Sequence, residues 1–98
     1  MNEDILQIGI YKATLIPSYV YRDGMLYTKV AIGEHIHSSK ATRNAGKYKI
    51  YVNSFPRCAQ PYSTYYIANT ENGKVYRYEA LHYLTGTLNE FVNILKEM

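Results

Sequence analysis

Tryptophan is absent from this sequence of 98 residues, and only one cysteine and three prolines occur. The single cysteine, Cys58, excludes an internal disulfide and is typical of proteins in a reducing compartment. No apolar run approaches the roughly 20 residues that a membrane-spanning helix needs. Residues 1–4 are acidic, unlike the basic start of a signal peptide. These absences predict a cytoplasmic protein with no membrane partner.

Acidic residues are missing from the centre of the chain. Residues 35–70 contain no Asp or Glu but hold five basic residues and five tyrosines. On either side of this stretch the charges nearly cancel, so the net charge of +3 comes from the centre. A localised positive field with interleaved aromatic hydroxyls favours binding of a negatively charged surface. The residues predicted to bind a partner are Lys40, Arg43, Lys47, Lys49, Tyr51, Arg57 and Tyr65.

The length and composition predict a single small α+β domain over residues 1–98. Hydrophobic residues make up 47% of the chain, which allows one modest core and argues against disorder. Tyr combines a ring that packs with a hydroxyl that stays hydrated, so it suits both half-buried strands and interfaces. We therefore expect most of the twelve tyrosines at the edge of the core.

Strand patterns fill the first half of the chain. Residues 5–16 are rich in β-branched side chains and predict one strand. Residues 19–21 and 25–32 predict two more strands, joined by a hairpin turn at Asp23-Gly24, a dipeptide that readily takes positive φ. Residues 34–46 are polar and have no period, so they predict a long loop, which is often functional.

The second half predicts further strands and one helix. The strands are expected at residues 47–53, 63–68 and 74–79. Alternation in the first of them predicts a half-buried strand with Lys47, Lys49 and Tyr51 on its outer face. The Asn72-Gly73 turn joins the other two.

A helix is predicted from Thr87 onward, because Thr87 and Glu90 fit a capping box. Its apolar residues recur at helical spacing. They are Leu88, Phe91, Val92, Leu95 and Met98. We expect Phe91 and Leu95 in the main core. The predicted fold is an antiparallel β-meander of about five to six strands with this C-terminal helix packed on the sheet.

Candidate catalytic and metal-binding residues are few. His35 and His37 would point the same way on an extended segment, but a zinc site needs further ligands. Only Cys58 and His82 remain as soft ligands, and they come from distant segments. Cys58 lies beside Arg57, which favours a thiolate, but no positioned base is evident. The sequence therefore predicts no metal site, no cofactor and no enzymatic activity.

Several interpretations fit the basic, tyrosine-rich centre. Tyr and Arg are favoured anchors of protein interfaces, so the centre could dock on an acidic protein surface. It could also follow a nucleic-acid backbone with tyrosines stacked on bases, although the aromatic-basic consensus of RNA-recognition sheets is absent. A solvated face without a partner is the third interpretation.

Residues 65–78 and 88–95 have the pattern of a hairpin followed by a helix. Gly73 precedes a strand that begins Lys74-Val75, and Phe91 and Leu95 are spaced as a helix core. This pattern resembles the end of SUKH-type immunity proteins, although their helical N-terminal part has no counterpart here. The resemblance implies a protein that binds and neutralises a toxin, often a nuclease.

An inhibitor of a host defence system such as CRISPR, encoded by a phage or mobile element, would have the same size and the same lack of catalytic residues. The sequence therefore predicts a non-catalytic inhibitory or neutralising protein. Its partner would be a larger protein, such as a nuclease or a nucleoprotein complex. One alternative is a nucleic-acid-binding β-domain, and the other, less favoured because no base is positioned beside Cys58, is a small enzyme that depends on His and Cys residues.

Overall fold

A computed structural model describes residues 4–30, 33–36, 41–55, 59, 62–81 and 87–98. Within these residues the chain forms nine strands and one helix, α1. The elements are β1 (Ile5–Ile8), β2 (Tyr11–Leu15), β3 (Tyr19–Arg22), β4 (Met25–Val30), β5 (Gly33–Ile36), β6 (Ala41–Ala45), β7 (Tyr48–Phe55), β8 (Tyr62–Asn69), β9 (Val75–Leu81) and α1 (Thr87–Lys96). The predicted α+β class, with antiparallel strands and one C-terminal helix, is confirmed.

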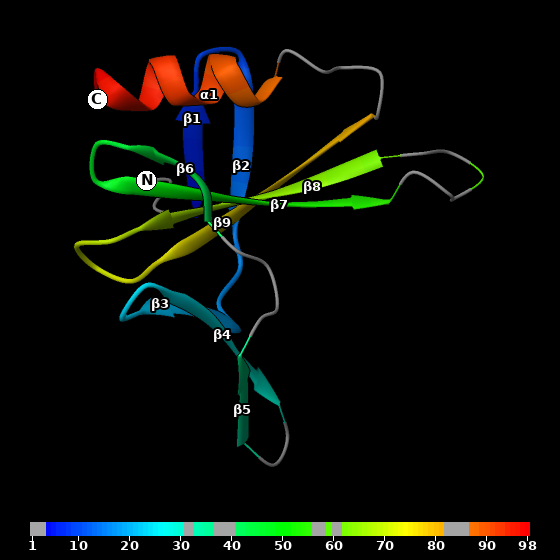
Figure 1. The fold of residues 1–98 in the computed structure, drawn as a ribbon, viewed down its shortest axis with the longest axis vertical. Helices are drawn as coiled ribbons and strands as arrows, with labels where there is room; N and C mark the ends of the chain where they lie inside the picture. The colour runs from blue at the N-terminus through cyan, green and yellow to red at the C-terminus, as the bar shows by residue number, and fades with distance from the viewer. Residues whose placement is uncertain (1–3, 31–32, 37–40, 56–58, 60–61, 82–86) are drawn as a thin grey trace.

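The strands form two antiparallel sheets (Figure 1). A six-stranded sheet has the order β1-β2-β9-β8-β7-β6, and a three-stranded sheet has the order β3-β4-β5. Strands β6 to β9 form a meander, because each pairs with the next along the chain. The β1–β2 hairpin joins this meander through β2 and β9, which are far apart in sequence. The predicted meander therefore holds within runs of consecutive strands but not across the β2–β9 pairing.

The large sheet is covered on both faces, by α1 on one and by the β3–β4 hairpin on the other (Figure 1). Strand β7 shows this most clearly. Ile50 packs in the cluster that contains Phe91 of α1, whereas its neighbour Tyr51 packs in the cluster that contains Leu26 of β4. The predicted alternation of residues 47–53 is thus present, but both faces of this strand are covered.

Backbone hydrogen bonds fasten the small sheet to the large one. The amide of Tyr21 in β3 donates to the carbonyl of Gly73 in the β8–β9 turn at 2.9 Å. The amide of Ile16 donates to the carbonyl of Val75 at 2.9 Å and so extends the β2–β9 pairing up to the start of the small sheet. Gly73 has a φ of +79°, and a Cβ built there would lie 3.1 Å from the Tyr21 carbonyl oxygen. Glycine therefore permits this close approach, and it also forms the predicted Asn72-Gly73 turn.

The helix packs as its sequence predicts. Phe91 and Leu95 are fully buried in the main core, with Val92 buried and Leu88 partly buried beside them. The Tyr11 hydroxyl donates to a Glu90 carboxylate oxygen at 2.9 Å and so ties β2 to the first turn of the helix. The helix ends at Lys96, so the exposed Met98 does not extend the predicted apolar stripe.

The single strand predicted over residues 5–16 is wrong. Gly9 has a φ of +61° and turns the chain back, so that β1 and β2 form a hairpin. A Cβ at this position would lie 2.8 Å from Ile94 Cδ1, the movable end of a side chain, so the positive φ is the stronger reason for glycine here. Ile8 is fully buried, whereas Ile10 is 86% exposed at the tip of the turn, although one continuous strand would place both on the same face.

The long loop predicted over residues 34–46 is also wrong. Strand β5 and strand β6 occupy most of it, and residues 37–40 lie outside the described residues. Within the part of the chain that the structure describes, β5 pairs with β4 alone and β6 pairs with β7 alone. Edge strands tolerate polar residues because solvent covers part of them, so they lack the hydrophobic period that marks a central strand.

Candidate functional site

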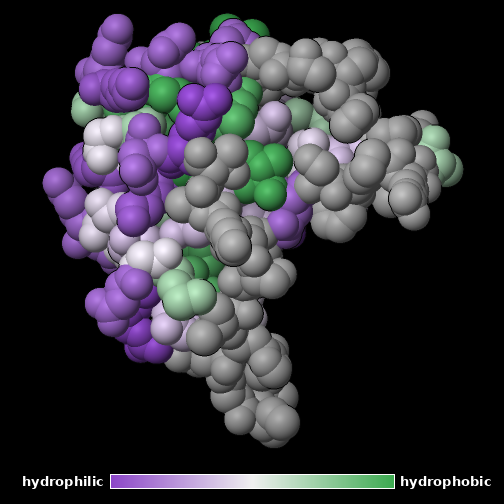
Figure 2. All heavy atoms as spheres, in the orientation of Figure 1, coloured by the Kyte–Doolittle hydropathy of each residue, from purple (hydrophilic) through white to green (hydrophobic). Residues whose placement is uncertain are grey.

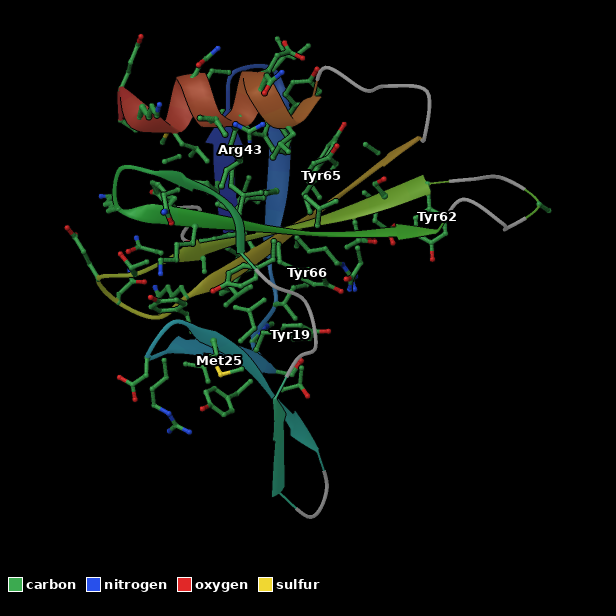
Figure 3. All side chains as sticks on the ribbon, viewed as in Figure 1. Tyr19, Met25, Arg43, Tyr62, Tyr65 and Tyr66 are labelled. Atoms are coloured by element: carbon green, nitrogen blue, oxygen red, sulfur yellow. The ribbon has the colours of Figure 1, made fainter. Side chains whose placement is uncertain are left out.

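The residues predicted to bind a partner do not form one surface. Arg43 is exposed and pairs with Ile50, so it lies on the face of the large sheet that α1 covers (Figure 3). Lys49 is the chain neighbour of Ile50 and therefore lies on the opposite face. Lys40 and Arg57 lie outside the described residues.

Two of the predicted lysines lie beside tyrosine rings. Lys49 is half-buried, and its Nζ lies 5.6 Å from the ring centroid of Tyr21 in β3. Lys47 is exposed in the β6–β7 turn, with its Nζ 5.6 Å from the ring centroid of Tyr48. These separations allow cation–π attraction, which limits the freedom of both ammonium groups. Their role in binding a partner stays a prediction.

The structure corrects the placement of Tyr51 and Tyr65, which were expected on the binding surface. Tyr51 is 1% exposed, and its hydroxyl donates to the carbonyl of Gly24 at 3.0 Å. The β3–β4 hairpin therefore covers its ring. Tyr65 is 6% exposed and lies edge-on to Phe91, with ring centroids 5.4 Å apart. Burial raises the pKa of both phenols. Both rings stabilise the fold and are not presented to a partner.

Tyr66 lies between the two sheets and stacks on Tyr19, with ring centroids 5.2 Å apart and planes 13° from parallel (Figure 3). Burial, and second the hydrogen bond with Tyr19, raise the pKa of Tyr66 from 10.0 to about 12. Burial also raises the pKa of Tyr48. The folded state therefore favours the neutral phenol at each of these positions.

This preference predicts alkaline unfolding. Below the ordinary tyrosine pKa of 10.0 the stabilisation is fully present, and it is lost as the pH rises toward the folded-state value of about 12 for Tyr66. Urea unfolding at a series of pH values between about 9 and about 11.5 should show falling stability. Tyr66→Phe should make this fall shallower. Equal pH slopes for the wild type and the variant would contradict the role of Tyr66.

The histidine and cysteine candidates are only partly covered by the structure. His37, Cys58 and His82 lie outside the described residues. Among the residues that are described, no group of three or more His, Cys, Asp or Glu side chains could hold a metal ion.

A surface that the sequence analysis missed lies on the outside of the β3–β4 hairpin. In the hairpin register Val20 faces Tyr27, and Arg22 faces Met25. The alternate residues of the same strands, including Tyr21 and Leu26, pack against the large sheet. The outward-facing residues define the outer hairpin face: Val20, Arg22, Met25 and Tyr27.

The outer hairpin face combines apolar, aromatic and cationic groups. Met25 is 42% exposed (Figure 3), and Tyr27 and Val20 are half-buried. The Arg22 guanidinium carbon lies 4.6 Å from the centroid of the Tyr27 ring. At this distance cation–π attraction holds the guanidinium over the ring. Met, Tyr and Arg are enriched in protein interfaces, so this composition is typical of a docking surface.

A pocket of about 350 Å³ adjoins this face at the edge of β3. Its apolar lining comes from the end of β2, the β2–β3 connection and β3, and includes Leu15, Ile16, Pro17 and Val20. Its polar lining comes from the hairpin and the β8–β9 turn, and includes Arg22, Asn72 and Lys74. We call this the edge pocket. Of the described residues that line it, the charged ones are Arg22 and Lys74, which are both basic.

Three turns meet on the flank beside the edge pocket, where hydrophilic side chains gather (Figures 1 and 2). Thr70 of the β8–β9 turn donates from its amide and its hydroxyl to the carbonyl of Lys47, at 2.9 and 2.7 Å. Gly73 of the same turn accepts from Tyr21. Backbone groups thus link the β8–β9 turn both to the β6–β7 turn and to strand β3, which leads into the β3–β4 turn. The charged residues at or beside them are Arg22, Asp23, Lys47, Lys49, Glu71 and Lys74.

The outer hairpin face had a signal in the sequence. The turn at Asp23-Gly24 fixes which residues of the two strands face each other, and the two-residue period then places Arg22, Met25 and Tyr27 together. The net charge of the N-terminal third is near zero, so the charge pattern of the sequence does not indicate the outer hairpin face.

Comparisons with known proteins leave the site to be interpreted from its geometry. No protein-family model matches the chain, and no curated protein or solved structure matches it either. No helix in the described part of the chain has the length and apolar character needed to cross a membrane.

Proposed function

We propose that this protein is a non-catalytic binding protein that inhibits or neutralises a larger protein, and that it docks through the outer hairpin face. The observation that carries the proposal is the placement of Arg22, Met25 and Tyr27 together on one accessible surface. Large, amphipathic anchors of this kind dominate binding energy at protein interfaces.

Tight docking is also favoured because the side chains and turns of the outer hairpin face are already held in place before a partner binds. Arg22 rests on the Tyr27 ring, and the turns beside it are linked by backbone hydrogen bonds. A guanidinium that is already placed loses less rotamer freedom when a partner binds. An interface built on a hairpin between a sheet and solvent therefore needs little rearrangement.

A partner with an acidic surface would best complement the charges beside the outer hairpin face. The residues at or beside the three turns include four basic and two acidic ones. The charged residues among the described lining of the edge pocket, Arg22 and Lys74, are both basic. Nucleases that hold Mg²⁺ do so with carboxylates, so they present acidic patches close to their active sites. We propose a nuclease or a nucleoprotein complex as the partner, in the role of a toxin neutralised by an immunity protein or of a CRISPR-type defence inhibited by a mobile element.

This proposal predicts that a substitution on the outer hairpin face lowers the affinity for the partner protein. The tagged protein is used to capture a stoichiometric protein from a lysate of its native cells, and the affinity for that protein is then measured. Met25→Glu should weaken binding at least about tenfold, because it places a carboxylate in the centre of the docking surface. Ile10→Glu is the matched control, since Ile10 is also apolar and exposed. It belongs to the β1–β2 turn, which lies on the other side of the large sheet from the β3–β4 hairpin (Figure 1).

Two outcomes would overturn the proposal. One is equal loss of affinity in Met25→Glu and Ile10→Glu, which would place the interface elsewhere. The other is a nucleic acid in place of a protein partner. That alternative predicts tight oligonucleotide binding by the wild type and a steep loss of affinity between about 50 and about 200 mM salt.

A further inference from the structure

We infer that Asn72 is a self-modification site, at which the amide nitrogen of Gly73 attacks the Asn72 side chain and converts the residue to isoaspartate. Asn72 is the one asparagine of the sequence that precedes a glycine. Glycine carries no Cβ beside the attacking nitrogen, so this dipeptide hinders the reaction least. The modification needs no partner protein and is therefore independent of the proposed function.

The reaction consumes only water and releases only ammonia. The Gly73 amide loses its proton to a solvent base, its nitrogen bonds to Asn72 Cγ, and Nδ2 leaves as ammonia with a proton from solvent. Water then opens the five-membered succinimide ring. Opening at the side-chain carbonyl gives aspartate, whereas opening at the main-chain carbonyl gives isoaspartate, in which the backbone passes through Cβ.

Hydrogen bonds hold both reacting groups in the folded protein. The Gly73 amide donates to the carbonyl of Asn69 at 2.8 Å, and Asn72 Oδ1 accepts from the Lys74 amide at 2.9 Å. An amide that donates to a backbone carbonyl gives up its proton to solvent only when its segment opens. The attack on Cγ requires the same proton to leave, so the closed β8–β9 turn protects Asn72.

The β8–β9 turn is a segment that can open while the core stays folded. None of residues 70–74 is buried, and Asn72 is exposed to solvent base. Segments that bury few side chains open locally at a lower cost in free energy than the core does. The rate of modification is therefore the rate in an unstructured peptide multiplied by the fraction of time that the turn is open.

Isoaspartate at this position would loosen the small sheet. It lengthens the backbone of the turn by one methylene carbon, immediately before the residue whose carbonyl accepts from the Tyr21 amide at 2.9 Å. The fit there is close, because even a Cβ on Gly73 would lie 3.1 Å from the Tyr21 carbonyl oxygen. A longer turn displaces the Gly73 carbonyl and so weakens the docking of the β3–β4 hairpin on the large sheet.

Parallel measurement of isoaspartate formation and hydrogen exchange tests this site. The folded protein and the capped peptide acetyl-Glu-Asn-Gly-Lys-amide, which copies residues 71–74, are incubated at the same mildly alkaline pH and temperature. Isoaspartate at Asn72 is quantified by peptide mapping. We expect the protein to react at least about tenfold more slowly than the peptide, by the same factor that protects its Gly73 amide against hydrogen exchange.

Thr70→Val and Thr14→Val form a matched pair of variants. The first removes the hydroxyl that donates to the Lys47 carbonyl at 2.7 Å and holds the turn, whereas Thr14 is an exposed residue of β2. Loss of that hydrogen bond should raise both the isoaspartate rate and the Gly73 exchange rate about fivefold. Thr14→Val should leave both rates unchanged. In the converted fraction, separated by its extra negative charge, the Tyr21 amide should exchange faster.

Three results would overturn the inference: isoaspartate formation as fast in the folded protein as in the peptide, a change in its rate without a matching change in Gly73 exchange, or equal rates in the two threonine variants. Unchanged exchange of the Tyr21 amide in the converted fraction would contradict the loosening of the hairpin. Partner capture is measured on unconverted protein, so failure of the docking proposal and failure of the modification site are seen separately.

Discussion

Phe91→Ala should unfold the protein or lower its free energy of unfolding by about 3–5 kcal/mol. Phe91 is 0% exposed at the centre of the main core. Domains of this size have only about 5–10 kcal/mol of stability in total, so a loss of this magnitude removes much of it.

The size of this effect follows from the rings around Phe91. Its centroid lies 5.2 Å from that of Tyr11, 5.4 Å from Tyr65 and 5.5 Å from Tyr78, each in an edge-on arrangement. Truncation removes all these contacts at once and leaves a cavity between α1 and the sheet. Three large rings held by strands cannot close such a cavity without moving the backbone.

Urea unfolding of Phe91→Ala beside the double variant Lys47→Ala/Lys49→Ala measures this difference. The lysine variant should change stability little, because cation–π and surface charge effects are each about 1 kcal/mol or less at such positions. A larger loss in the lysine variant than in Phe91→Ala would contradict the core assigned to α1.

Gly73→Ala should also lower the free energy of unfolding, by less than Phe91→Ala does. An L-residue at a φ of +79° costs about 1–2 kcal/mol. The added Cβ would also lie 3.1 Å from the backbone oxygen of Tyr21, which can move only if the β3–β4 hairpin moves. We therefore expect a further loss of about 1 kcal/mol from overpacking, together with loosening of the hairpin from the large sheet.

Gly24→Ala is the matched control for the conformational part of this loss. Gly24 has a φ of +84°, but a Cβ there would have no neighbour within 4 Å. Hydrogen exchange of the Tyr21 amide, which donates to Gly73, reports the docking of the hairpin directly. Faster exchange in Gly73→Ala than in Gly24→Ala is the expected result, and identical exchange and stability in the two variants would refute the close-approach argument.

Local signals in the sequence were sufficient for two of the hairpin turns and for the helix. Asp23-Gly24 and Asn72-Gly73 predict hairpins because few residues accept positive φ, and the spacing of Phe91 and Leu95 predicts which side of the helix is buried. Gly9 was misread because a single glycine inside an apolar run fits a strand as well as a turn. The turn at Gly9 becomes evident only from the pairing of β1 with β2 in the folded sheet.

The candidate site could be predicted less well than the turns and the helix, because it depends on how the β3–β4 hairpin packs on the large sheet. Tyr51 alternates with buried residues as expected, but its outward face becomes interior only because Leu26 and Tyr21 pack on it. The edge pocket unites residues near position 20 with residues near position 73 through the Tyr21–Gly73 hydrogen bond. Neither the pairing of β2 with β9 nor the docking of the hairpin has a local signature in the chain.

Photo-cross-linking tests the central claim, that a partner protein docks on the outer hairpin face, most directly. Benzoylphenylalanine is placed at Met25 in one sample and at Ile10 in another, and both are irradiated in native lysate. The account predicts one stoichiometric protein adduct from position 25 and none from position 10. An adduct from position 10 alone, or an adduct from position 25 that is nucleic acid, would contradict it.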